Sequence, residues 1–115
     1  MSVLNFAKDA QGTSAYAPQT SDLKYRAALT QSTETSITLP TDFQNYTVLF
    51  SYSAGANVWV DMTGGTASVP VTPSLATTTQ ELNPGQRQVP GGQDISMVTG
   101  DTSGAEVGIA IYGIP

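Results

Sequence analysis

The sequence predicts an all-β fold, a small antiparallel β-sandwich or jelly-roll-like domain of about seven or eight strands with an extended N-terminal arm. Three observations support this prediction. From residue 33 onward, apolar and polar residues alternate with the period of two that is typical of half-buried strands. Turn signals that contain glycine or proline recur about every ten residues. The length of 115 residues suits a single domain.

The N-terminal segment differs from the rest of the chain. Its apolar side chains are scattered through a polar background that glycine and proline interrupt, so we expect residues 1–20 to form an arm and residues 21–115 to form the domain. An arm of this length rarely becomes ordered by itself, and we therefore expect it to bind a neighbouring chain. Its candidate contact residues are Val3, Leu4, Phe6 and Tyr16.

The domain is expected to begin with two strands. Apolar residues alternate over Ser21–Leu29, which favours a strand over the alternative, a single helical turn. A second strand is expected over Thr33–Leu39, because its β-branched residues suit a strand and Pro40 ends it.

The most apolar stretch, Asn45–Met62, predicts a hairpin. Its two halves alternate with period two, and the segment Ser53–Ala56 between them has the length and the glycine of a hairpin connection. One face of each half is apolar, so this stretch is expected to supply the central core. The expected core residues are Tyr46, Val48, Phe50, Tyr52, Val58, Val60 and Met62.

The second half of the chain is punctuated by turns. Thr66–Val71 is expected to be an edge strand or a strand end, because Pro70 cannot donate a ladder hydrogen bond. Asn83-Pro84-Gly85 is a strong turn signal. The remaining expected strands are Gln86–Val89, Asp94–Thr99 and Glu106–Ile114.

The last of these strands has two distinct faces. Val107, Ile109 and Ile111 form an apolar face that is expected to lie in the core. On the other face, the small residues Gly108 and Ala110 lie beside Tyr112, where another sheet or chain would be able to approach closely.

The composition excludes several classes of function. The chain has no histidine and no cysteine, so the usual catalytic triads, Cys-His pairs and zinc sites are absent. Charged residues make up 11% of the chain, with four cations, so there is neither a basic nucleic-acid footprint nor a polybasic membrane-binding segment. No signal peptide or membrane-spanning segment is recognisable, and we expect synthesis in a cytoplasm.

The carboxylates offer no convincing reaction centre. Asp61, Asp94, Asp101 and Glu106 would be candidates for an acid–base pair, and Asp101–Glu106 would be able to offer oxygens to calcium. Asp94, Asp101 and Glu106 lie in or beside expected turns, where aspartate is common, and the spacing within Asp101–Glu106 does not match a calcium-binding loop. We therefore expect no catalytic residue, no metal and no cofactor.

Trp59 is the most ambiguous candidate. If its neighbours Val58 and Val60 face the core, Trp59 faces outward and suggests a protein interface or a sugar-binding platform. If Trp59 faces inward, it anchors the core. The apolar stripe of Val58, Val60 and Met62 favours the outward orientation.

The order of segments adds a further indication. "TSDLKYRAAL" and "TSITLP" are followed by "YTVLFSYSAGANVWV", "TASVPV", "ELNPGQRQVPGGQDISMVTGDTS" and "VGIAIYGIP". This succession resembles the small virion structural proteins of tailed bacteriophages. The resemblance implies a capsid decoration, or cement, protein: a small β-rich domain, often trimeric, that clamps neighbouring major capsid subunits.

The combined hypothesis is a non-enzymatic structural protein on the exterior of the virion, made in the host cytoplasm, which binds the major capsid protein shell as a homo-oligomer, with a trimer favoured. The alternatives are a receptor- or carbohydrate-binding fibre or spike module, and a tail or connector component. The candidate interface residues are Val3, Leu4, Phe6, Tyr16, Trp59 and Tyr112.

Overall fold

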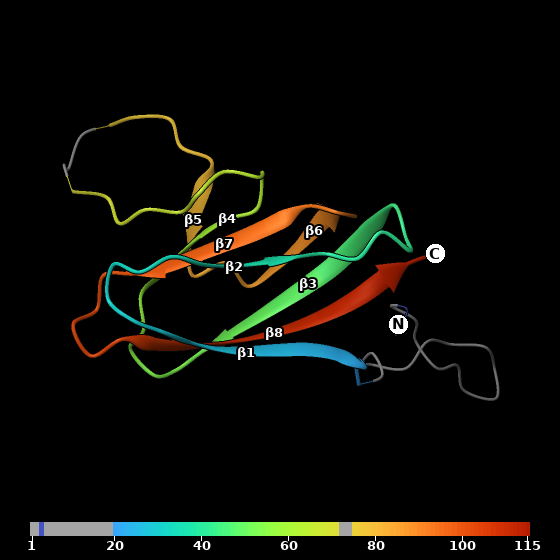
Figure 1. The fold of residues 1–115 in the computed structure, drawn as a ribbon, viewed down its shortest axis with the longest axis horizontal. Coiled ribbons are helices and arrows are strands. Elements are labelled where there is room, and N and C mark those ends of the chain that lie inside the picture. The colour runs from blue at the N-terminus through green and yellow to red at the C-terminus, as the bar shows by residue number, and fades with distance from the viewer. Residues whose placement is uncertain (1–2, 4–19, 72–74) are drawn as a thin grey trace, which may run out of the picture.

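Two antiparallel sheets face each other in the structure, a computed structural model that describes residue 3, residues 20–71 and residues 75–115 (Figure 1). These parts of the chain contain eight strands and no helix, and hence no helix that could span a membrane. The prediction of an all-β sandwich is confirmed.

Each sheet contains four strands. Sheet 1 consists, in spatial order, of β1 (Leu23–Leu29), β8 (Ala105–Ile114), β3 (Asn45–Tyr52) and β6 (Gln86–Pro90). Sheet 2 consists of β2 (Thr35–Thr38), β7 (Asp94–Thr99), β4 (Val58–Asp61) and β5 (Gln80–Leu82).

The pairing of the strands is nested. β1 pairs with β8, β2 with β7, β3 with β6 and β4 with β5, as in a long hairpin that has been rolled up. Two further pairings, β3 with β8 and β4 with β7, join these pairs into the two sheets. Eight strands with this order form a jelly roll, an architecture found in viral capsid and lectin domains.

The nested order shows that the predicted hairpin of Asn45–Met62 is wrong. β3 lies between β8 and β6 in sheet 1, whereas β4 lies between β7 and β5 in sheet 2, so the chain crosses from one sheet to the other between them. The apolar faces of β3 and β4 meet across the sandwich and do not lie side by side. Alternation identifies the buried face of a strand, but it does not identify the neighbouring strand.

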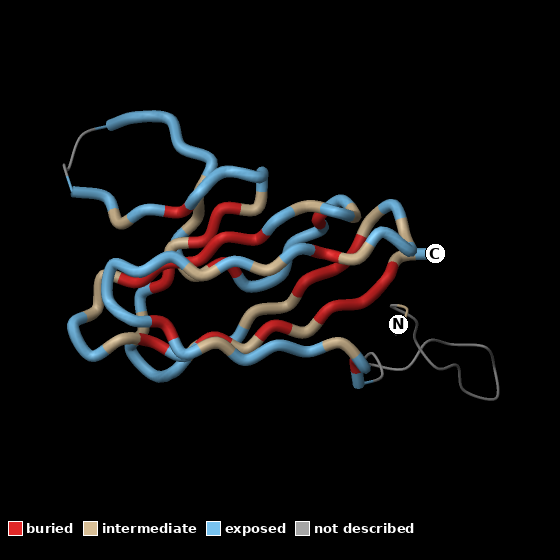
Figure 2. Tube along the Cα trace, in the orientation of Figure 1, coloured by how far each residue is buried: buried red, intermediate tan, exposed pale blue. Residues whose placement is uncertain are grey.

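The core between the sheets has the residues that the alternation predicts. Tyr46, Val48, Val58 and Val60 are fully buried, and Figure 2 shows buried stretches along strands of both sheets. Phe50, Tyr52 and Met62 are partly buried against this cluster. On β8, Val107, Ile109 and Ile111 are buried, and Ile111 lies opposite both Leu23 and Val48.

The expected strands at Ser21–Leu29 and Thr66–Val71 have different outcomes in the structure. Ser21–Leu29 contains a strand, β1, as predicted. Thr66–Val71 forms no strand, because its backbone binds side chains of sheet 2 instead of a neighbouring ladder, as described below. The three-residue strand β5 was not predicted, since it is too short to show a period.

The N-terminal arm meets the domain at one described point. Val3 forms an isolated parallel bridge with Gly113 at the end of β8. Nearby, the Ser21 hydroxyl donates a hydrogen bond to the carbonyl oxygen of Ile111, which fixes the start of β1. Leu4, Phe6 and Tyr16, the other predicted contact residues of the arm, lie outside the described residues.

Candidate interaction surfaces

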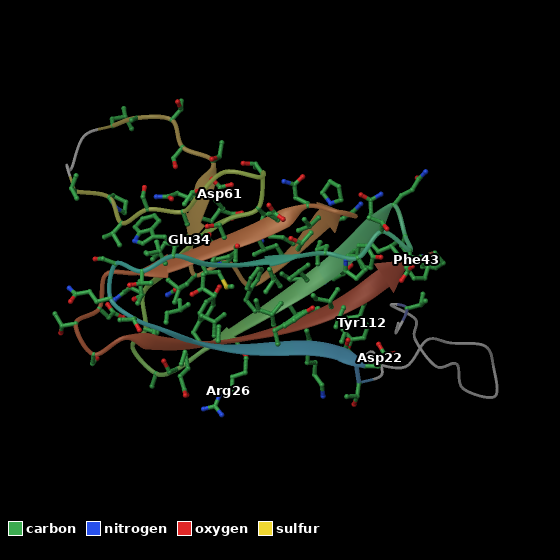
Figure 3. All side chains as sticks on the ribbon, in the orientation of Figure 1. Asp22, Arg26, Glu34, Phe43, Asp61 and Tyr112 are labelled. Atoms are coloured by element: carbon green, nitrogen blue, oxygen red, sulfur yellow. The ribbon has the colours of Figure 1, made fainter. Side chains whose placement is uncertain are left out.

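A long loop, residues 62–79, joins β4 to β5 and extends away from the two sheets (Figure 1). Asp61 lies at its base (Figure 3). The Asp61 carboxylate accepts hydrogen bonds from the Thr63 amide at 2.9 Å and from the Thr63 hydroxyl at 2.7 Å. Its other oxygen accepts one from the Thr79 hydroxyl at 2.8 Å. One buried carboxylate therefore ties the beginning of the loop to its end.

The same hydrogen bonds keep Asp61 ionised. Burial alone would raise the pKa of this carboxyl, because it penalises the charged form. The hydrogen bonds from Thr63 and Thr79, with a further one from the Gly65 backbone, outweigh this effect and hold the pKa of Asp61 below its usual value. Asp61 thus acts as an anionic anchor of the loop.

Sheet 2 holds the first half of the loop at two more points. The buried Ser96 hydroxyl accepts a hydrogen bond from the Ala67 amide at 2.9 Å and donates one to Glu34 at 2.6 Å. The Gln80 side chain binds both backbone groups of Ser68, at 3.0 and 2.8 Å. The base of the loop is therefore fixed by side chains of β4, β5 and β7.

Two apolar side chains of the loop, one on each side of residues 72–74, are exposed. Val71 is 92% exposed and Leu75 is fully exposed, and they are the two most exposed large apolar side chains among the described residues. Residues 62–79 contain no charged side chain. Burial of these two side chains by a partner would contribute about 1.5–3 kcal/mol each. A loop that is fixed at its base and exposes two large apolar side chains is suited to contact another protein.

Trp59 lies on the outer face of sheet 2, as the alternation predicts, because its neighbours Val58 and Val60 face the core. Trp59 is half-buried and lies opposite Leu82 on β5 and Val98 on β7. The first half of the loop covers part of this face, since Ala67 binds Ser96 there. The interface role of Trp59 stays a prediction.

A polar hollow of about 410 Å³ opens beside Asp61. Most of its lining residues are threonines and a serine, which carry hydroxyls, and Gln80 adds a side-chain amide. These groups donate and accept hydrogen bonds without a formal charge, which suits hydroxyl-rich ligands such as sugars. The lining residues are Asp61, Thr66, Ser68, Thr77, Thr78, Thr79 and Gln80.

The outer face of sheet 1 has a second hollow, of about 330 Å³ and mainly apolar. Leu49 on β3 and Ala110 on β8, which lie directly opposite each other, are among its lining residues. Gly108 has no side chain, and the Ser51 hydroxyl occupies the space beside it. A Cβ at Gly108 would lie 2.5 Å from Ser51 Oγ. Lys24 on β1 is its one charged lining residue. The small residues of β8 thus produce the depression that the sequence suggested.

Tyr112 on β8 and Arg26 on β1 lie on the same outer face of sheet 1 as this hollow. Tyr112, a predicted interface residue, is on the same outward side of β8 yet is only 5% exposed, so little of it is available to a partner. Arg26 on β1 pairs with Glu106 on β8 at 2.5 Å, and both side chains are largely exposed. Arg26 points away from the sandwich in Figure 3. An exposed pair of this kind contributes little stability.

The structure does not gather the carboxylates that the sequence singled out. Asp94 accepts a hydrogen bond from Thr38 at 2.5 Å, and Asp101 binds the Asn57 backbone and side chain at 2.9 and 3.3 Å. Glu106 pairs with Arg26, and Asp61 anchors the loop. Within residues 20–71 and 75–115, no group of three potential metal ligands occurs.

Another ion pair of the described residues lies near Tyr52. Arg87 binds Glu81 at 2.6 Å, and the Tyr52 hydroxyl donates to the carbonyl oxygen of Pro84 at 2.5 Å. Burial, and secondarily the charge of Glu81, raises the pKa of Tyr52 far above its usual range. Tyr52 therefore stays protonated and acts as a hydrogen-bond donor that holds the turn after β5.

Comparison with known proteins gives no match to any protein family, curated protein or solved structure. The class of molecule is therefore defined by its own structure: a jelly-roll β-sandwich with an anchored uncharged loop on one sheet and a shallow, mainly apolar hollow on the other.

Proposed function

We propose that this chain is a non-enzymatic structural protein of a phage virion, a decoration protein that binds the outside of the capsid and stabilises the shell of major capsid protein. The jelly-roll strand order carries this proposal, because that architecture recurs in viral capsid domains. A fold hosts many functions, so the surfaces must support the same conclusion.

The surfaces do support a role in assembly. The loop 62–79 is free of charge, and the hollow on sheet 1 has one charged lining residue. Burying such surfaces removes few charges from water, which keeps the cost of association low. A subunit that is joined to several neighbours needs more than one such surface, and these two lie on different sheets.

The arm is the third proposed contact. Val3, close to the free end of the arm, lies beside Gly113 at the end of β8, so this point of the arm contacts sheet 1 of its own chain. We assign to Val3, Leu4, Phe6 and Tyr16 the contact with a neighbouring subunit of the shell. Made in the host cytoplasm, the chain would act on the virion exterior, as a homo-oligomer for which a trimer is favoured.

Shell stability tests this proposal. Capsids assembled with the chain are expected to bind it and to survive heating or osmotic shock that opens capsids assembled without it. A matched control is the chain without residues 1–20, which is expected to fold but to protect less. Equal survival with and without the full chain would refute the stabilising role.

A carbohydrate- or receptor-binding module is the second candidate, and the polar hollow beside Asp61 favours it. Lectin domains also use the jelly roll. The half-buried Trp59 lies two residues before Asp61 in β4, on the same face of that strand. Glycan binding by the wild-type chain that is lost in Trp59→Ala would favour this role over a shell protein. We expect no such binding.

A further inference from the structure

Each sheet has two edge strands, and β1 is the longest of these four described strands. It has seven residues and contains neither proline nor glycine, whereas β6 has five and ends in Pro90, β2 has four and β5 has three. β1 pairs with β8, and no other described strand lies beside it, so it forms a free margin of sheet 1 (Figure 1). Such an edge is able to pair with a strand of another chain.

The pairing of β8 shows which backbone groups of β1 are free. The Ser53 amide donates to the carbonyl oxygen of Glu106 directly opposite it, at 3.0 Å, so Glu106 and every second residue after it direct their backbone groups toward β3. The residues between them direct their backbone groups toward β1, where their partners are Leu23, Tyr25 and Ala27. The other inner residues of β1 therefore direct their NH and C=O groups away from sheet 1: Lys24, Arg26 and Ala28.

The two sides of this edge differ in chemistry. Lys24 and Arg26 lie on the outer face of sheet 1, and both are exposed. Tyr25 lies on the core side but is 39% exposed, because it lies at the margin of the sandwich. Directly opposed side chains of neighbouring strands lie close enough to interact. A strand added to this edge would therefore place alternate side chains beside the two cations and beside Tyr25.

The charge of β1 selects the occupant. The chain carries a net charge of −5, yet two of its four cations lie two residues apart on this strand. Arg26 pairs with the exposed Glu106, whereas Lys24 forms no ion pair within residues 20–71 and 75–115. Centred antiparallel pairing with β1 of a second copy would bring these cations close to their own equivalents, which is unfavourable. Carboxylates are the side chains that complement this edge.

We propose that the free edge of β1 binds an extended segment of the shell protein by strand addition, and that this segment alternates carboxylate and apolar side chains. Its carboxylates lie beside Lys24 and Arg26, and its apolar side chains lie beside Tyr25. Its backbone pairs with the free groups of Lys24, Arg26 and Ala28. This inference rests on the proposed decoration role and specifies the chemistry of the contact.

Fluorescence anisotropy with the full chain and synthetic peptides tests the pairing. A labelled peptide as long as β1 that alternates glutamate and valine is expected to bind, and to bind less tightly as the salt concentration rises. A peptide that alternates lysine and valine is expected to bind about tenfold more weakly or less. The acidic peptide with a central proline is expected not to bind, because proline interrupts strand pairing. Absence of binding by the first peptide, or equal binding by any two of the three, would overturn the proposal.

Substitutions in β1 locate the site. Lys24→Gln combined with Arg26→Gln is expected to weaken binding of the acidic peptide by about tenfold. The matched control is Arg87→Gln, which removes a cation from the opposite edge of sheet 1 and is expected to leave binding unchanged. Equal binding by the wild-type chain and the double variant would overturn the proposal.

A proline in β1 tests the backbone contact. Ala28→Pro removes an NH group that points away from β8, so it is expected to keep the ladder with β8 and to abolish peptide binding. Ala28→Val is its control and is expected to bind. Undiminished binding by folded Ala28→Pro would overturn strand addition, and the charge variants test the site if this variant does not fold.

Capsid protection separates the two proposals. If the chain with Lys24→Gln and Arg26→Gln protected capsids as well as the wild-type chain does, the β1 contact alone would be refuted. If the wild-type chain bound the acidic peptide but never bound capsids, the decoration role alone would be refuted, and β1 would remain a strand-addition site for another acidic partner.

Discussion

Tyr46→Ala is expected to lower the free energy of unfolding by about 3–5 kcal/mol, the usual cost of removing a buried aromatic side chain. Tyr46 is completely buried on the core face of β3. Its ring meets that of Phe43 edge to face, with centroids 5.8 Å apart, and its hydroxyl accepts a hydrogen bond from the Phe43 amide at 3.0 Å. Urea unfolding followed by Trp59 fluorescence measures the change.

The matched control is Tyr46→Phe, which keeps the ring and removes only the hydroxyl. It leaves the Phe43 amide without its acceptor, at an expected cost of about 1 kcal/mol. If Tyr46→Ala lowered the free energy of unfolding by less than Tyr46→Phe does, the placement of this side chain in the central core would be contradicted.

Asp61→Asn is the substitution with the second large expected effect. It is expected to lower the free energy of unfolding by about 2–3 kcal/mol at neutral pH. The carboxylate accepts hydrogen bonds from both Thr63 and Thr79, and bonds to a charged acceptor contribute more than neutral ones. An asparagine amide keeps one acceptor oxygen, replaces the other with an NH2 group and carries no charge, so the tie between the two ends of the loop weakens. Faster proteolysis within residues 62–79 is expected to accompany the loss.

The pH dependence identifies the carboxylate as the cause. Because the pKa of Asp61 is lower in the folded protein than in the unfolded chain, its contribution is present above about pH 4 and is lost as the pH falls through the folded value. The stability difference between wild type and Asp61→Asn is therefore expected to shrink below about pH 4. Asp94→Asn is the control, since Asp94 is exposed and binds only Thr38 among the hydrogen bonds found, and it should change stability by less than about 0.5 kcal/mol. If the stability difference between wild type and Asp61→Asn stayed the same below about pH 4, the anchoring role of the carboxylate would be contradicted.

Local patterns in the sequence were sufficient to predict the fold class and the buried faces. Val107, Ile109 and Ile111 are buried because a period of two places them on one side of β8, and the same rule places Trp59 outward. Strand partners depend on contacts between distant residues, which no local pattern contains. For this reason Asn45–Met62 resembled a hairpin, although β3 pairs with β8 and β6.

The candidate surfaces were only partly predictable. The small residues of β8 suggested a close approach, and the hollow lies there. The loop was missed, because Thr66–Val71 alternates like a strand and its hydrogen bonds come from the side chains of Ser96 and Gln80. One signal was present in the sequence: residues 62–79 contain no charge, which is unusual for an exposed loop. The anchoring role of Asp61 requires the structure, since Thr63 and Thr79 meet only through it.

The position of this chain in the particle tests the central claim most directly. Electron cryomicroscopy of the virions made in cells that produce the chain would locate it. The decoration role predicts jelly-roll density repeated over the outer surface of the shell, with an arm that reaches a neighbouring capsid subunit. Particles that lack this density, or that contain it only in the tail or connector, would contradict the claim.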